Sequence, residues 1–363
     1  MTASTASLRL ADSEPHTHLA TLARQRRRLL FALSALLVLA AFASLALGPV
    51  SIPLGDVLAH LLTELGLDLG APAETAPFVS LRLSRTLLGI GLGAALGLAG
   101  ATLQGLFRNP LADPGLIGVS SGARLGATAF IVLGGASWVA TSPFAAFVAL
   151  PIAAWLGAIA TMSAVRLLAL RSGATHIAVL LLAGLAMTAF EEAVVGLLTA
   201  IADDEALRAA TLWRLGSLQG ATLGTAALVL GVTAIGAMIL LPLGRSLDAL
   251  TLGEAEAHHL GIRVERMKRV LVLVAALVVA TATAFAGVIG FVGLVVPHIV
   301  RLVAGPSHRT VLPASLIGGA LLVLIADLIA RTIAAPSELP LGVITALLGA
   351  PFLLALVVRR SHA

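Results

Sequence analysis

The chain has 363 residues, of which 59% are hydrophobic and only 11% are charged, with a formal net charge of +5. A soluble domain has about 25% charged residues, and no soluble fold of this length buries so much apolar surface. The absence of cysteine excludes a disulfide framework and a thiolate metal site. The composition therefore predicts an all-α membrane protein that lipid surrounds over most of its surface.

The first apolar run, about residues 29–49, follows a polar tail that ends in several arginines. A basic stretch before an apolar one also occurs in signal peptides, but this run is longer than their apolar part and more runs follow. We therefore expect residues 1–27 to be a cytoplasmic tail. Residues 28–363 are then one transmembrane domain whose first helix is retained.

Nine further apolar runs follow, and a spanning helix needs roughly 20 residues. The stretch 268–303 is nearly continuous, but glycines at 287, 290 and 293 predict a full helix, a tight turn and a shorter helix. The sequence therefore predicts about ten transmembrane helices. The nine runs lie near 86–107, 114–135, 143–169, 176–200, 220–243, 268–286, 289–303, 312–333 and 341–358.

Lysine and arginine indicate the orientation of these spans, because they favour cytoplasmic loops. Ten spans with the N-terminus inside place most of the basic residues inside and most of the acidic loop residues outside. Both termini are then cytoplasmic. The arginines lie at the ends of apolar runs rather than on one soluble face, so no nucleic-acid partner is expected.

The segment 246–269 is the longest charged stretch within the apolar array. Thr251 and Glu254 have the spacing of a capping box, and Gly261 is placed to end the helix that follows. These signals predict a short cytoplasmic helix over about 252–260 with an apolar side. Such a segment is either a solvated connection or a docking helix for a soluble partner, and the ordered caps favour docking.

Small residues form a stripe on the run 86–107, where Gly89, Gly93 and Gly97 are spaced by four and Ala101 follows. Side chains at this spacing lie on one face of a helix, and small ones allow two helices in lipid to approach closely. We interpret the stripe as a packing surface.

Gly118 to Gly122 match the nucleophile-elbow pattern G-x-S-x-G. The elbow needs a preceding strand and a soluble sheet, whereas this segment opens an apolar helix. An intramembrane serine hydrolase acting through Ser120 or Ser121 is therefore disfavoured, and helix packing is expected. His258 and His259 are adjacent and do not share a helix face, so no metal site is assigned.

Ionisable side chains inside membrane spans are candidates for function. Glu191 and Glu192 lie in the middle of the run 176–200. They either line a pathway or form buried hydrogen bonds, and in an ion-coupled secondary transporter they would be proton sites. Asp327 and Arg331 are four residues apart, so they are expected to pair along one helix.

The chain contains one lysine, Lys268, and it lies in no glycine-rich P-loop. The protein therefore has no Walker motif of its own and is not expected to be an enzyme by itself. If ATP drives its transport, a separate subunit must supply the nucleotide site.

Five motifs follow one another between residues 50 and 358: RLSR at 82–85, QGLFRNPLADPGLIGVSSG at 104–122, LGEAEAHHLG at 252–261, GVIGFVGLVVPHIVR at 287–301 and ELPLGVITALLGAP at 338–351. Together they resemble the FecCD-type permeases, the membrane subunits of ATP-binding-cassette importers for iron-siderophores, haem and cobalamin. The resemblance implies the type II importer fold with ten helices per subunit, in agreement with the number of apolar runs.

The resemblance also implies partners in the bacterial inner membrane. Two permease copies would enclose one pathway, two ATPase subunits with ATP and Mg would dock on the cytoplasmic face, and a periplasmic binding protein would deliver the ligand. In this family, outer arginines pair with glutamates of the binding protein, and the matching positions are Arg82, Arg85 and Arg331. The segment 247–261 matches the family's coupling helix. Its expected ATPase-coupling residues are Leu252, Gly253, Glu254, Ala257, Leu260 and Gly261.

Residue chemistry alone does not specify the ligand. The segments 198–218 and 253–261 look most like those of haem permeases, so haem is the expected ligand. A ferric siderophore and then cobalamin are the alternatives. No cofactor is expected on this chain itself.

The sequence departs from the family pattern at a few positions. Ser84 replaces the usual proline, Arg124 stands where alanine is common, and Glu191 and Glu192 replace small or apolar residues. His176 lies near the cytoplasmic end of its helix and is expected near the inner gate. Glu191, Glu192 and His176 are thus the candidate pathway residues.

Overall fold

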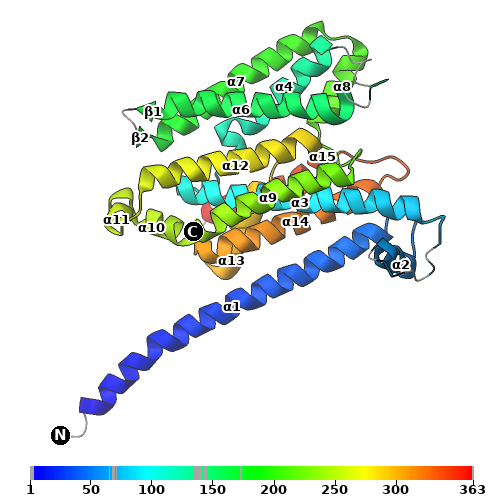
Figure 1. Cartoon of the computed structure of the whole chain (residues 1–363). Coiled ribbons are helices and arrows are strands. Elements are labelled where there is room, and N and C mark those ends of the chain that lie inside the picture. The colour runs from blue at the N-terminus through cyan, green and yellow to red at the C-terminus, as the bar shows by residue number, and fades with distance from the viewer. Residues whose placement is uncertain are drawn as a thin grey trace.

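A computed structural model of the chain describes residues 4–64, 66–67, 70, 72–134, 141–142, 145–171 and 174–361. Apart from two short strands, the regular structure of these residues is helical (Figure 1). The fold is therefore all-α, as predicted. In chain order the elements are α1 (Ser4–Ala46), α2 (Leu54–Glu64), α3 (Ala76–Phe107), η1 (Pro114–Ile117), α4 (Val119–Gly134), η2 (Ala145–Ala149), α6 (Leu150–Ala169), β1 (Leu170–Arg171), β2 (Ala174–Thr175), α7 (Ile177–Ile201), α8 (Asp204–Arg214), α9 (Leu223–Leu240), η3 (Leu241–Leu243), α10 (Gly244–Leu252), α11 (Glu254–His259), α12 (Val264–Ala286), α13 (Val292–Ala304), α14 (His308–Thr332) and α15 (Leu341–Ser361).

The first helix includes most of the predicted polar tail. α1 begins at Ser4, and its part from Ala23 to Ala46 is long and apolar enough to cross a membrane. Its N-terminal part extends beyond the other helices in Figure 1. Residues 1–3 and the side chains before Ala23 lie outside the described residues. The proposed boundary at residue 27 therefore falls within a continuous helix.

Among the described residues, seven helices are long and apolar enough to cross a membrane. Three shorter apolar helices, α4, α13 and α15, occupy the remaining predicted runs. The predicted glycine break also occurs, since α12 ends at Ala286 and α13 begins at Val292. About ten helices therefore account for the ten apolar runs. The two amphipathic helices α2 and α8 were not predicted.

Helix α3 lies at the centre of the bundle, and 89% of its most apolar part is buried. A Cβ atom on Gly93 would lie 2.2 Å from the carbonyl oxygen of Gly319, and one on Gly97 would lie 2.1 Å from that of Ser315. Both distances are too short for any side chain, so α3 and α14 pack backbone against backbone. The predicted packing role of the glycine stripe is confirmed.

The G-x-S-x-G motif also serves packing. Gly118 has a φ of 80° and ends η1, and the Ser121 hydroxyl donates a hydrogen bond to the Gly118 carbonyl oxygen at 3.0 Å. A Cβ on Gly122 would lie 2.6 Å from the carbonyl oxygen of Gly157 on α6. The motif therefore opens α4 and lets it approach α6 closely, as the sequence predicts.

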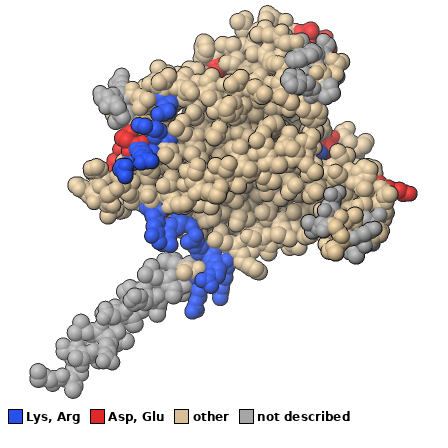
Figure 2. Space-filling view, viewed as in Figure 1, with Lys and Arg blue, Asp and Glu red and all other residues tan. Residues whose placement is uncertain are grey.

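The bundle has two chemically different ends. We call the end with α10, α11 and the β1–β2 hairpin the α11 end, and the end with α2, α8 and the loop 333–340 the α8 end (Figure 1). Figure 2 shows most of the visible lysines and arginines at the α11 end, with some acidic residues among them, and further acidic residues at the α8 end. This is the distribution expected if the α11 end is cytoplasmic.

Candidate docking and pathway sites

Arg82, a predicted docking residue, is buried, with 8% of its surface exposed. Its guanidinium donates hydrogen bonds to the carbonyl oxygens of Leu45 (2.9 Å), Ala46 (3.0 Å) and Val50. The last carbonyls of a helix have no partner within the helix and favour a positive charge. Arg82 therefore caps the C-terminus of α1.

Arg85 and Arg331, the other two predicted docking residues, belong to one ionic cluster at the α8 end. Arg85 donates to both oxygens of Asp327 (3.0 and 3.2 Å) and to both oxygens of Glu338 (2.9 Å). Arg331 pairs with Asp327 at 3.5 Å, as predicted, and donates to the carbonyl oxygen of Ser44 at 2.6 Å. We call Arg85, Asp327, Arg331 and Glu338 the Arg85 cluster. Residues from α1, α14 and the loop before α15 therefore pair with these two arginines within the chain, and Arg331 Nε is left without a hydrogen bond in the described structure.

Glu338 is the most exposed member of the Arg85 cluster, with 23% of its side chain exposed. Gln219 also donates a hydrogen bond to it at 3.0 Å. Burial by itself would raise the pKa of Glu338, but the hydrogen bond from Gln219 and the charge of Arg85 together lower this pKa below its usual value. The carboxylate is therefore held in its charged form.

The predicted coupling segment, residues 247–261, is two helices rather than one. α10 continues to Leu252, and α11 begins at Glu254 after Gly253, whose φ of 142° suits glycine. Thr251 lies inside α10, where its hydroxyl donates to the Asp248 carbonyl oxygen at 2.6 Å. The predicted capping box is therefore wrong, because the helix that enters from α9 and η3 does not end before position 251.

The predicted stop at Gly261 is confirmed. Gly261 has a φ of 82°, and its N–H bonds to the carbonyl oxygen of His258 at 2.9 Å. The N–H of Ile262 bonds to the carbonyl oxygen of Ala257 at 3.1 Å. These two bonds form a Schellman motif, which fixes where the chain leaves α11.

Apolar side chains of the coupling segment point in opposite directions. Leu252 is 69% exposed and Leu260 is 65% exposed, whereas Ala257 is fully buried. Ala257 thus faces the chain's own core, and the two leucines form the apolar surface that faces outward.

Lys268 fixes the coupling segment to the start of α12. Its ammonium is 2.6 Å from Glu254 and 2.9 Å from Glu265, and it donates to the carbonyl oxygen of Thr175 at 3.3 Å. The Lys268 side chain is 4% exposed. One buried cation therefore joins α11, α12 and the β1–β2 hairpin.

Asp248 joins the coupling segment to α14. Its carboxylate accepts hydrogen bonds from the His308 backbone N–H (2.7 Å) and from the Ser307 hydroxyl (3.0 Å), and it lies 2.8 Å from His308 Nδ1. A carboxylate at a helix N-terminus satisfies free N–H groups and favours the helix dipole. α14 therefore extends from Asp248 at one end to the Arg85 cluster at the other.

The candidate pathway glutamates occupy different environments. Glu191 is 1% exposed and accepts a hydrogen bond from Thr161, while its Oε2 has no partner. Glu192 has a side chain that is 48% exposed and forms an ion pair with Arg124 of α4. His176 is exposed and directly precedes α7 at the α11 end. The three residues are therefore not gathered into one site.

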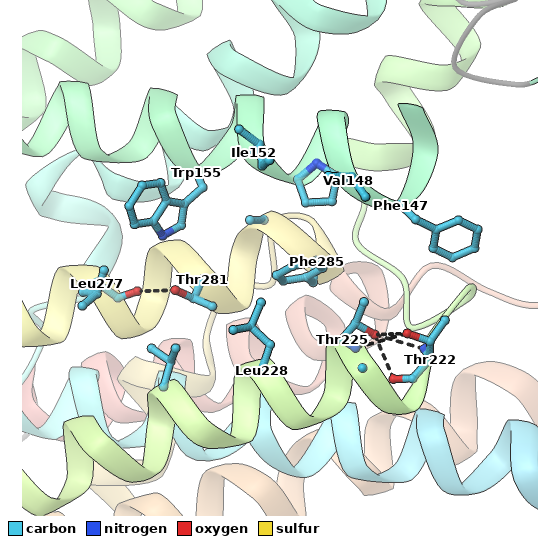
Figure 3. Close-up of a pocket in the computed structure, with 14 residues that line it drawn as sticks. Phe147, Val148, Ile152, Trp155, Thr222, Thr225, Leu228, Leu277, Thr281 and Phe285 are labelled. Carbon is cyan, nitrogen blue, oxygen red and sulfur yellow. Dashed lines mark hydrogen bonds between the residues drawn. The ribbon is translucent and has the colours of Figure 1, made fainter. Parts of the chain in front are cut away.

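A cavity of about 640 Å³ lies between η2–α6, α9 and α12 (Figure 3). Trp155, Leu228 and Phe285 point into it, and none of the described residues that line it is charged. The hydroxyls at its edge are already bonded, Thr222 to Thr225 and Thr281 to the Leu277 carbonyl oxygen. Among its described lining residues the wall is almost entirely apolar and offers no charged group to an ionic ligand, so we do not assign it as the transport site.

About ten apolar helices, seven of them long enough to cross a membrane, with ionisable side chains buried among them form a bundle of the kind found in membrane transport proteins. The FecCD transport family matches residues 36–359, and the chain belongs to this family of ABC importer permeases.

Several relatives share most of its length. The chain is 42% identical to the hemin transport system permease protein HmuU of Yersinia pestis over 285 residues, which cover 78% of this chain and 84% of the relative. It is 43% identical to the cobalamin import system permease protein BtuC of Halobacterium salinarum over 297 residues, which cover 81% and 77%. A solved inward-facing structure of a metal-chelate type ABC transporter superposes with a TM-score of 0.79 at 31% identity and covers 92% of this chain and 99% of that one.

Proposed function

We propose that this chain is the permease through which a bacterial importer moves haem from the periplasm to the cytoplasm. The proposal depends most on the similarity to the hemin permease, which covers 84% of that relative. The segments 198–218 and 253–261, which look like those of haem permeases, support it further. A ferric siderophore or cobalamin is the alternative ligand, and the similar identity to a cobalamin permease supports the latter. Membership of the ABC importer family argues against an ion-coupled carrier.

The α11 end is the proposed contact with two ATPase subunits, which bind the ATP and Mg. The exposed Leu252 and Leu260 offer apolar surface to such a partner. Lys268 joins α11 to α12, so a displacement of α11 would also displace α12. Asp248 accepts a hydrogen bond from the first residue of α14, so the same displacement would reach α14. This end is then cytoplasmic, together with both termini, in the inner membrane.

The α8 end is the proposed contact with a periplasmic binding protein, through Arg82, Arg85 and Arg331. These arginines already have partners within the chain, so docking requires an arginine to exchange its internal partner for a glutamate of the binding protein. Glu338 is the partially exposed partner of Arg85, and a glutamate from the binding protein has the same chemistry. Glu338→Gln should therefore strengthen binding-protein affinity. Unchanged affinity would argue against a docking role for Arg85.

ATP-dependent uptake in proteoliposomes tests the proposed function. The liposomes contain this chain, its ATPase and its binding protein, and haem, a ferric siderophore and cobalamin are offered separately. Uptake of haem alone is expected, by a pathway between two permease copies. Uptake of only another ligand would keep the importer and reject haem, and uptake that a proton gradient drives without ATP would reject the importer.

A further inference from the structure

An ion pair lies within the membrane-spanning part of the protein, between α4 and α7. Arg124 and Glu192 form it, and the family resemblance accounts for neither residue. The Arg124 side chain is 14% exposed, and its Nε has no hydrogen-bond partner. The pair thus leaves part of the hydrogen-bonding capacity of the guanidinium unused.

Glu192 also lines a cavity of about 220 Å³ between α4, α7 and α8. The cavity wall also includes Arg214, which is exposed on the last turn of α8. The cavity wall thus has one carboxylate, which Arg124 pairs with from α4, and one further cationic residue. Glu191 does not line this cavity, because its side chain points to Thr161 on α6. The polar members of the wall are Thr128, Glu192, Thr199, Thr211 and Arg214.

The exposed face of α7 next to this cavity is apolar. Leu185, Phe190 and Leu197 are 60–66% exposed, and a Cβ on Gly196 would meet no atom within 4 Å. A half-exposed carboxylate in hydrocarbon is expensive, so Glu192 indicates that this face borders a water-filled space. An apolar face next to two guanidinium groups suits an amphipathic anion.

We propose that the cavity between α4, α7 and α8 binds a carboxylate group of the transported ligand. Arg214 contacts this carboxylate directly, and Arg124 contacts it after exchanging Glu192 as its partner. A volume of 220 Å³ is small for a whole cofactor-sized ligand, so only a carboxylate arm enters while the apolar part lies along α7. This inference rests on the proposed function, because haem has two propionate carboxylates on an apolar ring. Cobalamin has amides at its periphery and lacks such groups.

Direct binding tests the site without the binding protein, which could itself select for carboxylates. The full-length permease in complex with its ATPase is placed in lipid nanodiscs, and haem and haem dimethyl ester are titrated by absorbance against empty nanodiscs. The wild type should bind haem about tenfold more tightly than the diester, because a charge-assisted hydrogen bond is lost on esterification. Arg214→Gln and the neutral pair Arg124→Gln/Glu192→Gln should each bring this ratio close to one.

Arg208→Gln is the matched control, because Arg208 is also exposed on α8 but does not line the cavity. Its ratio should equal that of the wild type. Equal binding of haem and the diester by the wild type, or an unchanged ratio in both cavity variants, would overturn the site. The uptake assay tests the proposed function independently of this site. That function is rejected if the wild type imports cobalamin or a siderophore but not haem.

Discussion

The two ends of the bundle use their charged residues in opposite ways. At the α8 end the Arg85 cluster is closed within the chain, with Asp327 1% and Arg331 3% exposed. At the α11 end Lys268 is equally buried, but its partners Glu254 and Glu265 are 43% and 37% exposed. The first network is mostly buried, whereas both carboxylates of the second are open to water.

The α11 end is also the more open of the two in its apolar residues. Leu252 and Leu260 of the coupling segment point outward, while Ser44 and the end of α1 cover the arginines of the α8 end. Substitutions at the α8 end should therefore act first on stability. Substitutions at the α11 end should act first on association with the ATPase.

Asp327→Ala should have the largest effect. It leaves Arg85 without its bidentate partner and Arg331 without the carboxylate that lies 3.5 Å from its Nε, and breaking a buried ion pair costs about 3–5 kcal/mol. We expect a large fall in the unfolding temperature of the detergent-solubilised protein. Asp204→Ala is the control, because Asp204 is exposed at the same end and its removal should cost about 0.5 kcal/mol or less. Equal effects of the two substitutions would show that the Arg85 cluster is not a stabilising network.

Leu260→Asp should weaken association with the ATPase without lowering stability, which distinguishes the α11 end from the α8 end. About 65% of Leu260 is exposed, so the substitution should leave the unfolding temperature unchanged. If the ATPase buries this leucine, the loss is about 2 kcal/mol of binding free energy, or roughly thirtyfold in affinity. Co-purification and a binding titration with the ATPase measure it. Leu67→Asp is the control at the α8 end, where Leu67 is 59% exposed, and it should leave this affinity unchanged.

The spans could be predicted from the sequence because their information is local. Apolar runs indicate the helices, and four-residue glycine spacing identifies the α3 face that meets α14. Gly261 likewise indicates where α11 ends, because its positive φ suits glycine. The Arg85 cluster could not be found in this way, because Arg85 is separated from Asp327 by 242 residues and from Glu338 by 253. Only the tertiary fold brings these side chains together.

The capping-box error and the two missed helices have related causes. Thr251 and Glu254 satisfy a local pattern, but the incoming helix continues through position 251. The sequence does contain a local signal for α8, since Asp203 precedes it and accepts a hydrogen bond from the Ala206 N–H. Its acidic first turn is a further N-terminal signal. Arg124 and Glu192 stood out individually as departures, but only the structure shows that they pair.

Lys268→Gln should have a smaller effect than either of the first two substitutions. It removes the cation between Glu254 and Glu265, but water can reach both carboxylates because they are partly exposed. We expect a stability loss of about 1 kcal/mol, together with a several-fold weaker ATPase affinity as α11 loosens. Arg269→Gln changes an exposed neighbouring charge and should alter neither quantity. A Lys268 variant with normal ATPase affinity would show that the rigidity of α11 does not matter for docking.

The pH dependence of the Arg85 cluster should be the smallest effect, because Glu338 is partly exposed. Its pKa is lower in the folded protein than the usual value of 4.5. The folded state therefore gains stability from this group above pH 4.5 and loses it as the pH falls through the lowered pKa. The unfolding temperature should accordingly decrease over this acid range, and Glu338→Gln should remove that part of the decrease. If the variant and the wild type show the same acid dependence, the charge of Glu338 contributes nothing to the cluster, and Asp327 alone holds Arg85.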